Sequence, residues 1–360
     1  MGNVVDLKAV MPKGSTTRLL AVGDIYFNRT DLYRPYKEIE KLLGEMDVRF
    51  CNYEAAFTSV ENPLPGRALT NIPLKSPPSN IQALKEGCFD FISLANNHIL
   101  DYGTEALEET LTAFKGYRMS FGGAGRTIEE ALNPTIIERH GITIGFLAFA
   151  AAFPPSYRAT SSLGGIAPIR IHTSYAPDFA REAEHPGRVP AIITEPDIND
   201  IARMEDAVIR LKRQVDHVVV SYHWGVPGRY DLVDYQRSLG HRTIDAGASV
   251  VLGHHAHNLQ AVETYKQGVI LYGLSQFIFD LPALGDYGFS EETIAAIIEF
   301  DRSKICSVTF VPLIAEGFST PRFSSRKEAK YIFELLKRLS VPLETVLKWD
   351  KEDYVMCLHL

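Results

Sequence analysis

The chain has 360 residues, of which 46% are hydrophobic and 22% are charged, and its formal net charge is -7. This length can bury a substantial core in one large α/β domain or in about two smaller domains. The acidic balance argues against general electrostatic binding of nucleic acid. The sequence also contains no run of about 18 apolar residues, which is the length needed to span a bilayer. The four cysteines form no CxxC pair, and residues 1–14 lack the pattern of a secretory signal peptide. We therefore expect a reduced, cytoplasmic protein that binds neither nucleic acid nor membranes.

Short apolar segments alternate with helical patterns in the first half of the chain. Residues 19–22, 48–53 and 89–95 are predicted strands, whereas residues 36–46 and 104–114 have the apolar spacing of helices. This alternation predicts an α/β fold with a largely parallel sheet. Ligands bind beyond the carboxyl ends of the strands in such sheets.

The second half repeats the alternation and adds hairpins. Residues 218–221 and 250–252 are predicted strands on either side of a helix at residues 235–246. Turns at residues 266–268 and 301–303 predict antiparallel pairs. A mixed or double sheet is therefore expected.

Two further segments differ from this pattern. Residues 153–200 are predicted to be a long loop region, because the stretch 154–190 is rich in Pro, Gly, Ser and Arg. Such a region either lines a functional site or forms a surface insertion. Near the C-terminus, residues 327–337 predict an amphipathic helix that packs on the body.

Polar residues follow five of the predicted strands. In chain order they are Gly23–Asp24, Asn52–Tyr53–Glu54, Asn96–Asn97–His98 with Asp101, His223–Trp224–Gly225, and Gly253–His254–His255–Ala256–His257. Taken singly, such a motif is more often a turn, a helix cap or a hydrogen-bonded core histidine. Three histidines within residues 254–257, however, are uncommon without a metal or catalytic role. Carboxylate, amide and imidazole ligands together favour Mn, Fe or Zn over Ca or Mg, and two such ions can activate a bridging hydroxide.

The order of these motifs, followed by Tyr–Gly–Leu–Ser–Gln–Phe–Ile–Phe–Asp at residues 272–280, resembles the CapA family of capsule-synthesis, poly-γ-glutamate-associated proteins. That family is similar to the calcineurin-like metallophosphatases. Over residues 18–317 the resemblance implies a metallophosphatase-like four-layer α/β/β/α sandwich with mixed sheets. A lead-in at residues 1–17 and a C-terminal helical extension at residues 318–360 would flank this domain.

The resemblance also implies roles for individual residues. Its metal-ligand positions fall on Asp24, Glu54, Asn97, His223, His255 and His257. Glu54 would take the bridging position, and Asp24, Glu54 and His255 would take part in catalysis. His98 would act as the acid or base, with its ring oriented by Asp101. His254 competes with His255 for the inward-facing position.

Several positions depart from the related patterns. Metallophosphatases carry a histidine two residues after the first aspartate, where this chain has Tyr26, and usually an aspartate where this chain has Glu54. The capsule family's Gly–Asn–Phe is Ser–Gln–Phe at residues 275–277, and its proline between the last histidines is Ala256. The expected cofactor is therefore a divalent Mn, Fe or Zn, with one ion, two ions or none as open alternatives.

A further set of residues next to the motifs is expected to bind substrate. The set is Arg29, Tyr53, Trp224, Arg229, His254 and Gln276. An arginine can hold a carboxylate through two parallel hydrogen bonds, and aromatic side chains can wall a pocket. The alternatives are exposed surface arginines and aromatic residues of the core.

The resemblance implies an enzyme that acts on a peptide or poly-glutamate-type substrate by metal-assisted amide hydrolysis or transfer. Three alternatives stay open: a metal-independent peptide epimerase that moves a proton at Cα, a non-catalytic component of capsule polymer assembly, and a phosphodiesterase. Polymer-assembly relatives commonly carry an N-terminal membrane anchor. Because no such segment is found in this sequence, we expect a free-standing enzyme.

Overall fold

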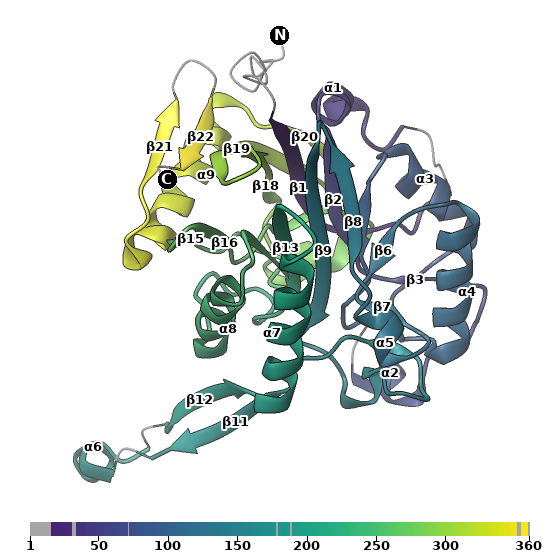
Figure 1. The fold of residues 1–360 in the computed structure, drawn as a ribbon. Helices are drawn as coiled ribbons and strands as arrows, with labels where there is room; N and C mark the ends of the chain where they lie inside the picture. Colours follow the sequence, from purple (N-terminus) through teal and green to yellow (C-terminus); the bar gives the residue numbers. More distant parts are fainter. Residues whose placement is uncertain are drawn as a thin grey trace.

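The computed structural model describes residues 16–30, 34–70, 72–177, 179–187, 189–350 and 354–358. Two β-sheets lie at the centre of the described part, with helices on their outer sides (Figure 1). Of the lead-in expected at residues 1–17, residues 1–15 lie outside the described part, and Thr17 begins the first strand.

The larger sheet contains ten of the described strands. From edge to edge it runs through β21 (Leu347–Asp350), β22 (Val355–Leu358), β19 (Ile305–Glu316), β18 (Glu292–Phe300), β1 (Thr17–Tyr26), β2 (Val48–Tyr53), β5 (Phe91–Ser93) and β6 (Phe121–Gly122), while β17 (Gln276–Phe279) pairs with β1 and β20 (Thr320–Phe323) with β19. Strands β1, β2, β5 and β6 are parallel, whereas β18 and β19 form an antiparallel hairpin. The mixed sheet and the turn at residues 301–303 are therefore confirmed.

The smaller sheet contains six of the described strands. Its order is β15 (Val262–Tyr265), β16 (Gly268–Leu271), β14 (Val250–His254), β13 (His217–His223), β9 (Ile142–Ala150) and β8 (Thr135–Arg139). The four inner strands are parallel, and β15 and β16 form the hairpin expected around residues 266–268.

Helices cover the outer sides of the two sheets. Figure 1 shows α3 (Ile81–Glu86) and α4 (Gly103–Gly116) beside the larger sheet, and α7 (Ile198–Lys212) and α8 (Asp234–Asp245) beside the smaller one. The remaining α-helices of the described part are α1 (Glu40–Gly44), α2 (Pro65–Thr70), α5 (Ile128–Ala131), α6 (Phe179–Glu184) and α9 (Arg326–Ser340). Among these helices, none has the length and the apolar composition needed to cross a bilayer.

The two sheets pack face to face through aromatic side chains. Phe146 of β9 stacks on Phe91 of β5 with ring centroids 4.9 Å apart and on Phe50 of β2 at 6.5 Å. Side chains alternate between the two faces of a strand, so neighbouring valines of β13 lie on opposite faces of the smaller sheet. Val219 joins this core between the sheets, whereas Val218 joins the core beneath α7 and α8. The four-layer α/β/β/α sandwich is confirmed.

The segment expected as a loop region at residues 153–200 contains regular structure. Strands β11 (Ile171–Ala176) and β12 (Ala191–Pro196) form an antiparallel hairpin that projects from the body, with α6 at its tip (Figure 1). The Pro- and Gly-rich composition of the stretch concealed a strand pattern in β11, where the β-forming residues Ile171, Thr173 and Tyr175 occupy every second position.

The segment 318–360 is more than the expected helical extension. It contains the expected amphipathic helix as α9, whose Ser325 side chain accepts a hydrogen bond from Glu328 N at the first turn. It also contributes three strands to the larger sheet: β20 and β22 pair with β19, and β21 pairs with β22. The pairing of β22 with β19 joins residues about 50 positions apart, which local sequence patterns do not reveal.

Candidate metal and catalytic site

The polar residues at the strand ends meet where the carboxyl ends of both parallel strand sets come together. Asp24 lies on β1, Glu54 follows β2, Asn97 follows β5, His223 ends β13, and the histidine cluster follows β14. Contributions from both sheets explain why motifs that are 230 positions apart in sequence, as for Asp24 and His254, are in contact. The expected gathering of these side chains is therefore seen.

Asp24 is held in place by a close backbone crossing at Gly23. A Cβ atom on Gly23 would lie 2.0 Å from the carbonyl oxygen of Ser275, so only glycine fits there. The same close approach allows a backbone hydrogen bond, in which Asp24 N donates to Ser275 O at 3.0 Å. Asn52 Nδ2 then donates to Asp24 Oδ1 at 2.9 Å, which orients the carboxylate.

The turn after β14 separates the roles of the adjacent histidines. His254 is fully buried behind Asp24, and its Nδ1 lies 2.8 Å from Asp24 Oδ1. His255 and His257 have φ angles of 86° and 52°, in the left-handed region that non-glycine residues adopt mainly at constrained sites. This backbone turns both side chains into the cavity that they line. His255, and not His254, is therefore the inward-facing residue.

Glu54 is fully buried, and neither of its carboxylate oxygens has a hydrogen-bond partner. Its Oε1 lies 3.3 Å from His223 Nε2 and 3.7 Å from His257 Nε2. Two groups place their ligand atoms within 4.8 Å of one another: Glu54 with His255 and His257, and Asp24 with Glu54 and His223. A buried carboxylate without a partner is costly, whereas a cation would satisfy it. The donor set therefore fits a divalent ion, with Glu54 common to both groups.

The protonation preferences of His255 and His257 agree with a metal site. Burial, followed by neighbouring histidines, lowers the pKa of His255 to about 3, and burial lowers that of His257 to about 4. Neutral imidazole is the form that binds metals. Burial opposes ionisation of Asp24, but His254 holds the pKa of Asp24 below its ordinary value. Burial, followed by the charge of Asp24, raises the pKa of Glu54 well above the ordinary value.

His98 lies in a buried network centred on Asp101. Asp101 Oδ2 accepts from His98 Nδ1 at 2.6 Å and from Leu74 N at 2.8 Å. Its Oδ1 accepts from Arg67 Nε at 2.6 Å and from the Tyr157 hydroxyl at 2.7 Å. Asp101 thus fixes the ring of His98 as expected, and His98 Nε2 lies on the side of Glu54, 3.9 Å from Oε1. Arg67 and Tyr157 escaped the sequence analysis because neither belongs to a recognisable motif.

The Asp101→Asn variant is expected to be less stable at neutral pH by about 2 kcal/mol, because it loses charged hydrogen bonds. Burial would raise the pKa of Asp101, but His98 and Arg67 lower it below 3.8, its ordinary value. The charged form therefore stabilises the fold above that value, and this stabilisation disappears as the pH falls through the lowered pKa. Urea unfolding at a series of pH values should show a constant difference between the two proteins above pH 3.8 and a shrinking difference below it.

The control for this measurement is Asp206→Asn, which removes an exposed ion pair with Arg210 on α7. Exposed pairs contribute about 0–1 kcal/mol, so this variant should follow the wild-type curve. Equal stability of Asp101→Asn and the wild type at pH 7 would contradict the role given to the network.

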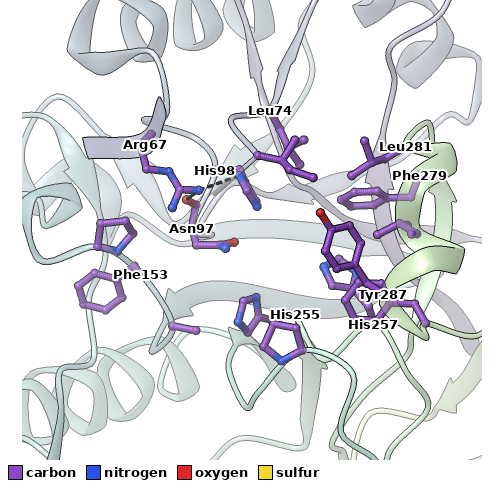
Figure 2. A pocket seen from close by; sticks show the side chains of 16 residues that line it. Arg67, Leu74, Asn97, His98, Phe153, His255, His257, Phe279, Leu281 and Tyr287 are labelled. Carbon is purple, nitrogen blue, oxygen red and sulfur yellow. Dashed lines mark hydrogen bonds between the residues drawn. The ribbon is translucent and has the colours of Figure 1, made fainter. Parts of the chain in front are cut away.

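A cavity of about 660 Å³ opens above these groups. Figure 2 shows Asn97, His98 and His255 around its middle, with Phe153 at one end and Phe279, Leu281 and Tyr287 at the other. The start of the 153–200 region thus lines the site, through Phe153 and Pro154.

The two arginines expected to bind substrate have other partners. Arg29 Nε donates to Asp280 at 2.7 Å, and Arg29 Nη2 donates to Ser319 O at 2.9 Å. Arg229 is exposed and pairs with Asp231. Neither arginine lines the cavity, because each guanidinium is directed toward a nearby carboxylate.

The expected aromatic walls, Tyr53 and Trp224, belong to the core. Tyr53 is fully buried with its hydroxyl paired to Ser76. Trp224 is also fully buried, and its Nε1 donates to Tyr272 O at 2.9 Å. Both side chains are directed away from the cavity because strand side chains alternate in direction next to each motif residue.

Two other expected positions also lie outside the cavity lining. Gln276 is buried, and its amide nitrogen pairs with the carbonyl of Ser290. Tyr26, at the position of the metallophosphatase histidine, is buried with its hydroxyl donating to Lys75 O at 3.2 Å. Tyr26 therefore adds no donor to the two ligand groups described above.

The family of bacterial capsule synthesis protein PGA_cap matches residues 18–281. The capsule biosynthesis protein CapA of Bacillus anthracis is 27% identical over 345 residues, covering 92% of this chain and 75% of that protein. The PGA biosynthesis protein CapA of Bacillus subtilis (strain 168) is 28% identical over 323 residues, covering 88% and 73%.

A probable polyglutamine synthesis accessory protein of Mycobacterium tuberculosis is 26% identical over 272 residues, covering 73% of this chain and 65% of that protein. The family match extends over the whole motif series, from the strand that carries Asp24 to Asp280. This chain therefore belongs to the bacterial capsule synthesis protein PGA_cap family, within the metallophosphatase-like superfamily.

Proposed function

We propose that this protein is a metal-dependent enzyme that hydrolyses or transfers an amide bond in a peptide or poly-glutamate-type substrate. The relatives named for capsule and PGA biosynthesis support a CapA-like role. The observation that carries the proposal is the buried Glu54 carboxylate, which has no hydrogen-bond partner and lies among imidazoles directed toward it.

In this proposal the metal-holding residues are Asp24, Glu54, Asn97, His223, His255 and His257. Imidazole donors in the set favour Mn, Fe or Zn. A bound divalent ion supplies Lewis-acid polarisation of the amide carbonyl and lowers the pKa of water. Asn97 already contacts one of its neighbours, since its Oδ1 lies 2.7 Å from His223 Nε2.

His98 is the proton donor in this proposal. Its Nδ1 donates to Asp101, so the doubly protonated ring carries its second proton at Nε2, on the side of the cavity. In hydrolysis the C–N bond breaks, the hydroxyl of water joins the acyl carbon, the leaving nitrogen takes a proton from His98, and the remaining proton of water returns to His98. In transfer, an acceptor nucleophile takes the place of water.

Removal of divalent metal is the test. Dialysis against a chelator should lower amide turnover by more than about tenfold, and Mn, Fe or Zn should restore it while Mg and Ca do not. Metal content should follow activity. The metal should also stabilise the fold against heat, because a ligand at 100 times its Kd adds about 2.7 kcal/mol. Full turnover after complete metal removal would refute the proposal.

A second candidate is a metal-independent peptide epimerase, which is favoured by the buried Tyr26 at the superfamily's histidine position. Glu54 and His98 would then remove and return a proton at Cα. Incorporation of solvent deuterium at one Cα, insensitive to chelator, would support this candidate. Turnover of a chromogenic phosphodiester that is lost in Asn97→Ala would instead indicate phosphodiesterase chemistry.

A further inference from the structure

We propose that the cavity binds an aromatic or branched aliphatic side chain of a peptide, next to the amide that reacts, and not a run of glutamates. This inference rests on the proposed function and names the substrate class of the same site. The side chain would lie against an apolar wall formed by Phe279, Leu281, Leu284, Tyr287 and Phe289.

The apolar wall is in direct contact with the metal-ligand set through one imidazole. The His257 ring lies 4.9 Å from Phe279 in an edge-on arrangement and 5.2 Å from Phe289. The same ring places Nε2 3.7 Å from Glu54 Oε1. A side chain on the wall therefore belongs to the residue next to the reacting bond, because only one ring separates the wall from Glu54.

The shape of the wall suits a flat or branched side chain. Tyr287 and Phe289 lie with ring centroids 6.3 Å apart, within the range of aromatic contacts. The cavity volume of about 660 Å³ is in the range of small-molecule sites. Figure 2 shows Phe279, Leu281 and Tyr287 of the wall at one end and the polar groups in the middle, so a short peptide can reach both.

The charges around the cavity disfavour a polyanion. Arg67 is the one lysine or arginine among the described lining residues, and its Nε is paired with Asp101 at 2.6 Å. Outside the lining, Arg29 is paired with Asp280 and Arg229 with Asp231. A glutamate run needs unpaired cations along its path, and the net charge of -7 adds long-range repulsion.

The test compares three probes on the metal-loaded full chain: N-acetyl-Phe-Ala amide, N-acetyl-Leu-Ala amide and N-acetyl-Glu-Ala amide. Turnover gives kcat/KM, and saturation-transfer NMR measures binding independently of turnover. We expect the Phe and Leu probes to exceed the Glu probe by at least about tenfold in both measurements. Equal or tighter binding of the Glu probe, or no binding of any probe, would overturn the inference.

Three variants locate the effect. Tyr287 lines the cavity and is 61% exposed, so Tyr287→Ala should fold and should reduce the preference for the Phe probe several-fold. Tyr287→Lys should shift the preference toward the Glu probe by about tenfold. Tyr331→Ala is the matched control, because Tyr331 is 54% exposed on α9 and does not line the cavity. Unchanged preferences in both Tyr287 variants would also count against the inference.

The two arms separate this inference from the proposed function. Selective binding of the Phe and Leu probes without any turnover would leave the inference standing and contradict the amidase activity. Turnover with a preference for the Glu probe would support the amidase activity and contradict the inference about the side chain.

Discussion

Glu54→Gln is expected to lose at least about 100-fold in turnover and yet to make the metal-free protein more stable. Metal sites lose about 10–100-fold in affinity or activity when even a supporting residue is removed, and Glu54 is shared by both ligand groups. Without metal, its buried carboxylate has no hydrogen-bond partner and lies close to Asp24. Relief of that burial should add about 1–3 kcal/mol to the free energy of unfolding.

The control for this prediction is Glu263→Gln. Glu263 is also buried, but its carboxylate accepts from the Tyr272 hydroxyl at 2.6 Å and contacts Arg237 at 3.3 Å. The substitution at this satisfied glutamate should destabilise the protein and leave turnover unchanged. Urea unfolding in chelator and turnover in added metal are the two measurements. Retained turnover in Glu54→Gln would refute the shared-ligand role.

Gly23→Ala is expected to lower the free energy of unfolding by more than about 3 kcal/mol, at the upper end of overpacking effects. Its new Cβ would lie 2.0 Å from Ser275 O and 2.8 Å from Ser275 C, and backbone atoms have no rotamer by which to move aside. Any shift would also displace Asp24, whose N–H donates to Ser275 O. Turnover should therefore fall together with stability.

The matched glycine is Gly44, the last residue of α1. It is exposed, and no atom lies within 4 Å of a Cβ built there. Gly44→Ala should leave stability unchanged or raise it by up to about 1 kcal/mol. Thermal and urea unfolding of the two variants measure this difference. A loss of less than about 1 kcal/mol in Gly23→Ala would contradict the prediction, because it would mean that the backbone at Ser275 can shift to accept a Cβ atom.

The order of motifs in the sequence by itself identified the family and the layered fold, and it predicted the residues of the ligand set. The gathering of the motif residues follows from local patterns, since these residues come after short buried strands and parallel strands direct their carboxyl ends to one edge. His223 and His257 were therefore candidate ligands without knowledge of any distance, whereas His254 and His255 stayed alternatives. The alternation of strands and helices in the first half predicted the parallel part of the larger sheet for the same reason.

Side-chain direction next to a motif required the tertiary structure. Trp224 follows His223 directly, yet it lies in the core, because adjacent residues at a strand end have opposite directions. The choice between His254 and His255 depended on a left-handed backbone angle at His255. Arg29 was a reasonable substrate-binding residue until its carboxylate partner, Asp280, was located 251 positions away.

Contacts distant in sequence were decided only by the tertiary structure. Arg67 and Tyr157 converge on Asp101 from separate segments, and the aromatic wall combines the end of β17 with the residues that follow it. Strand β22 pairs with β19 in the same way. Patterns within a segment show which face is buried, but the partner that covers this face depends on how the whole chain packs.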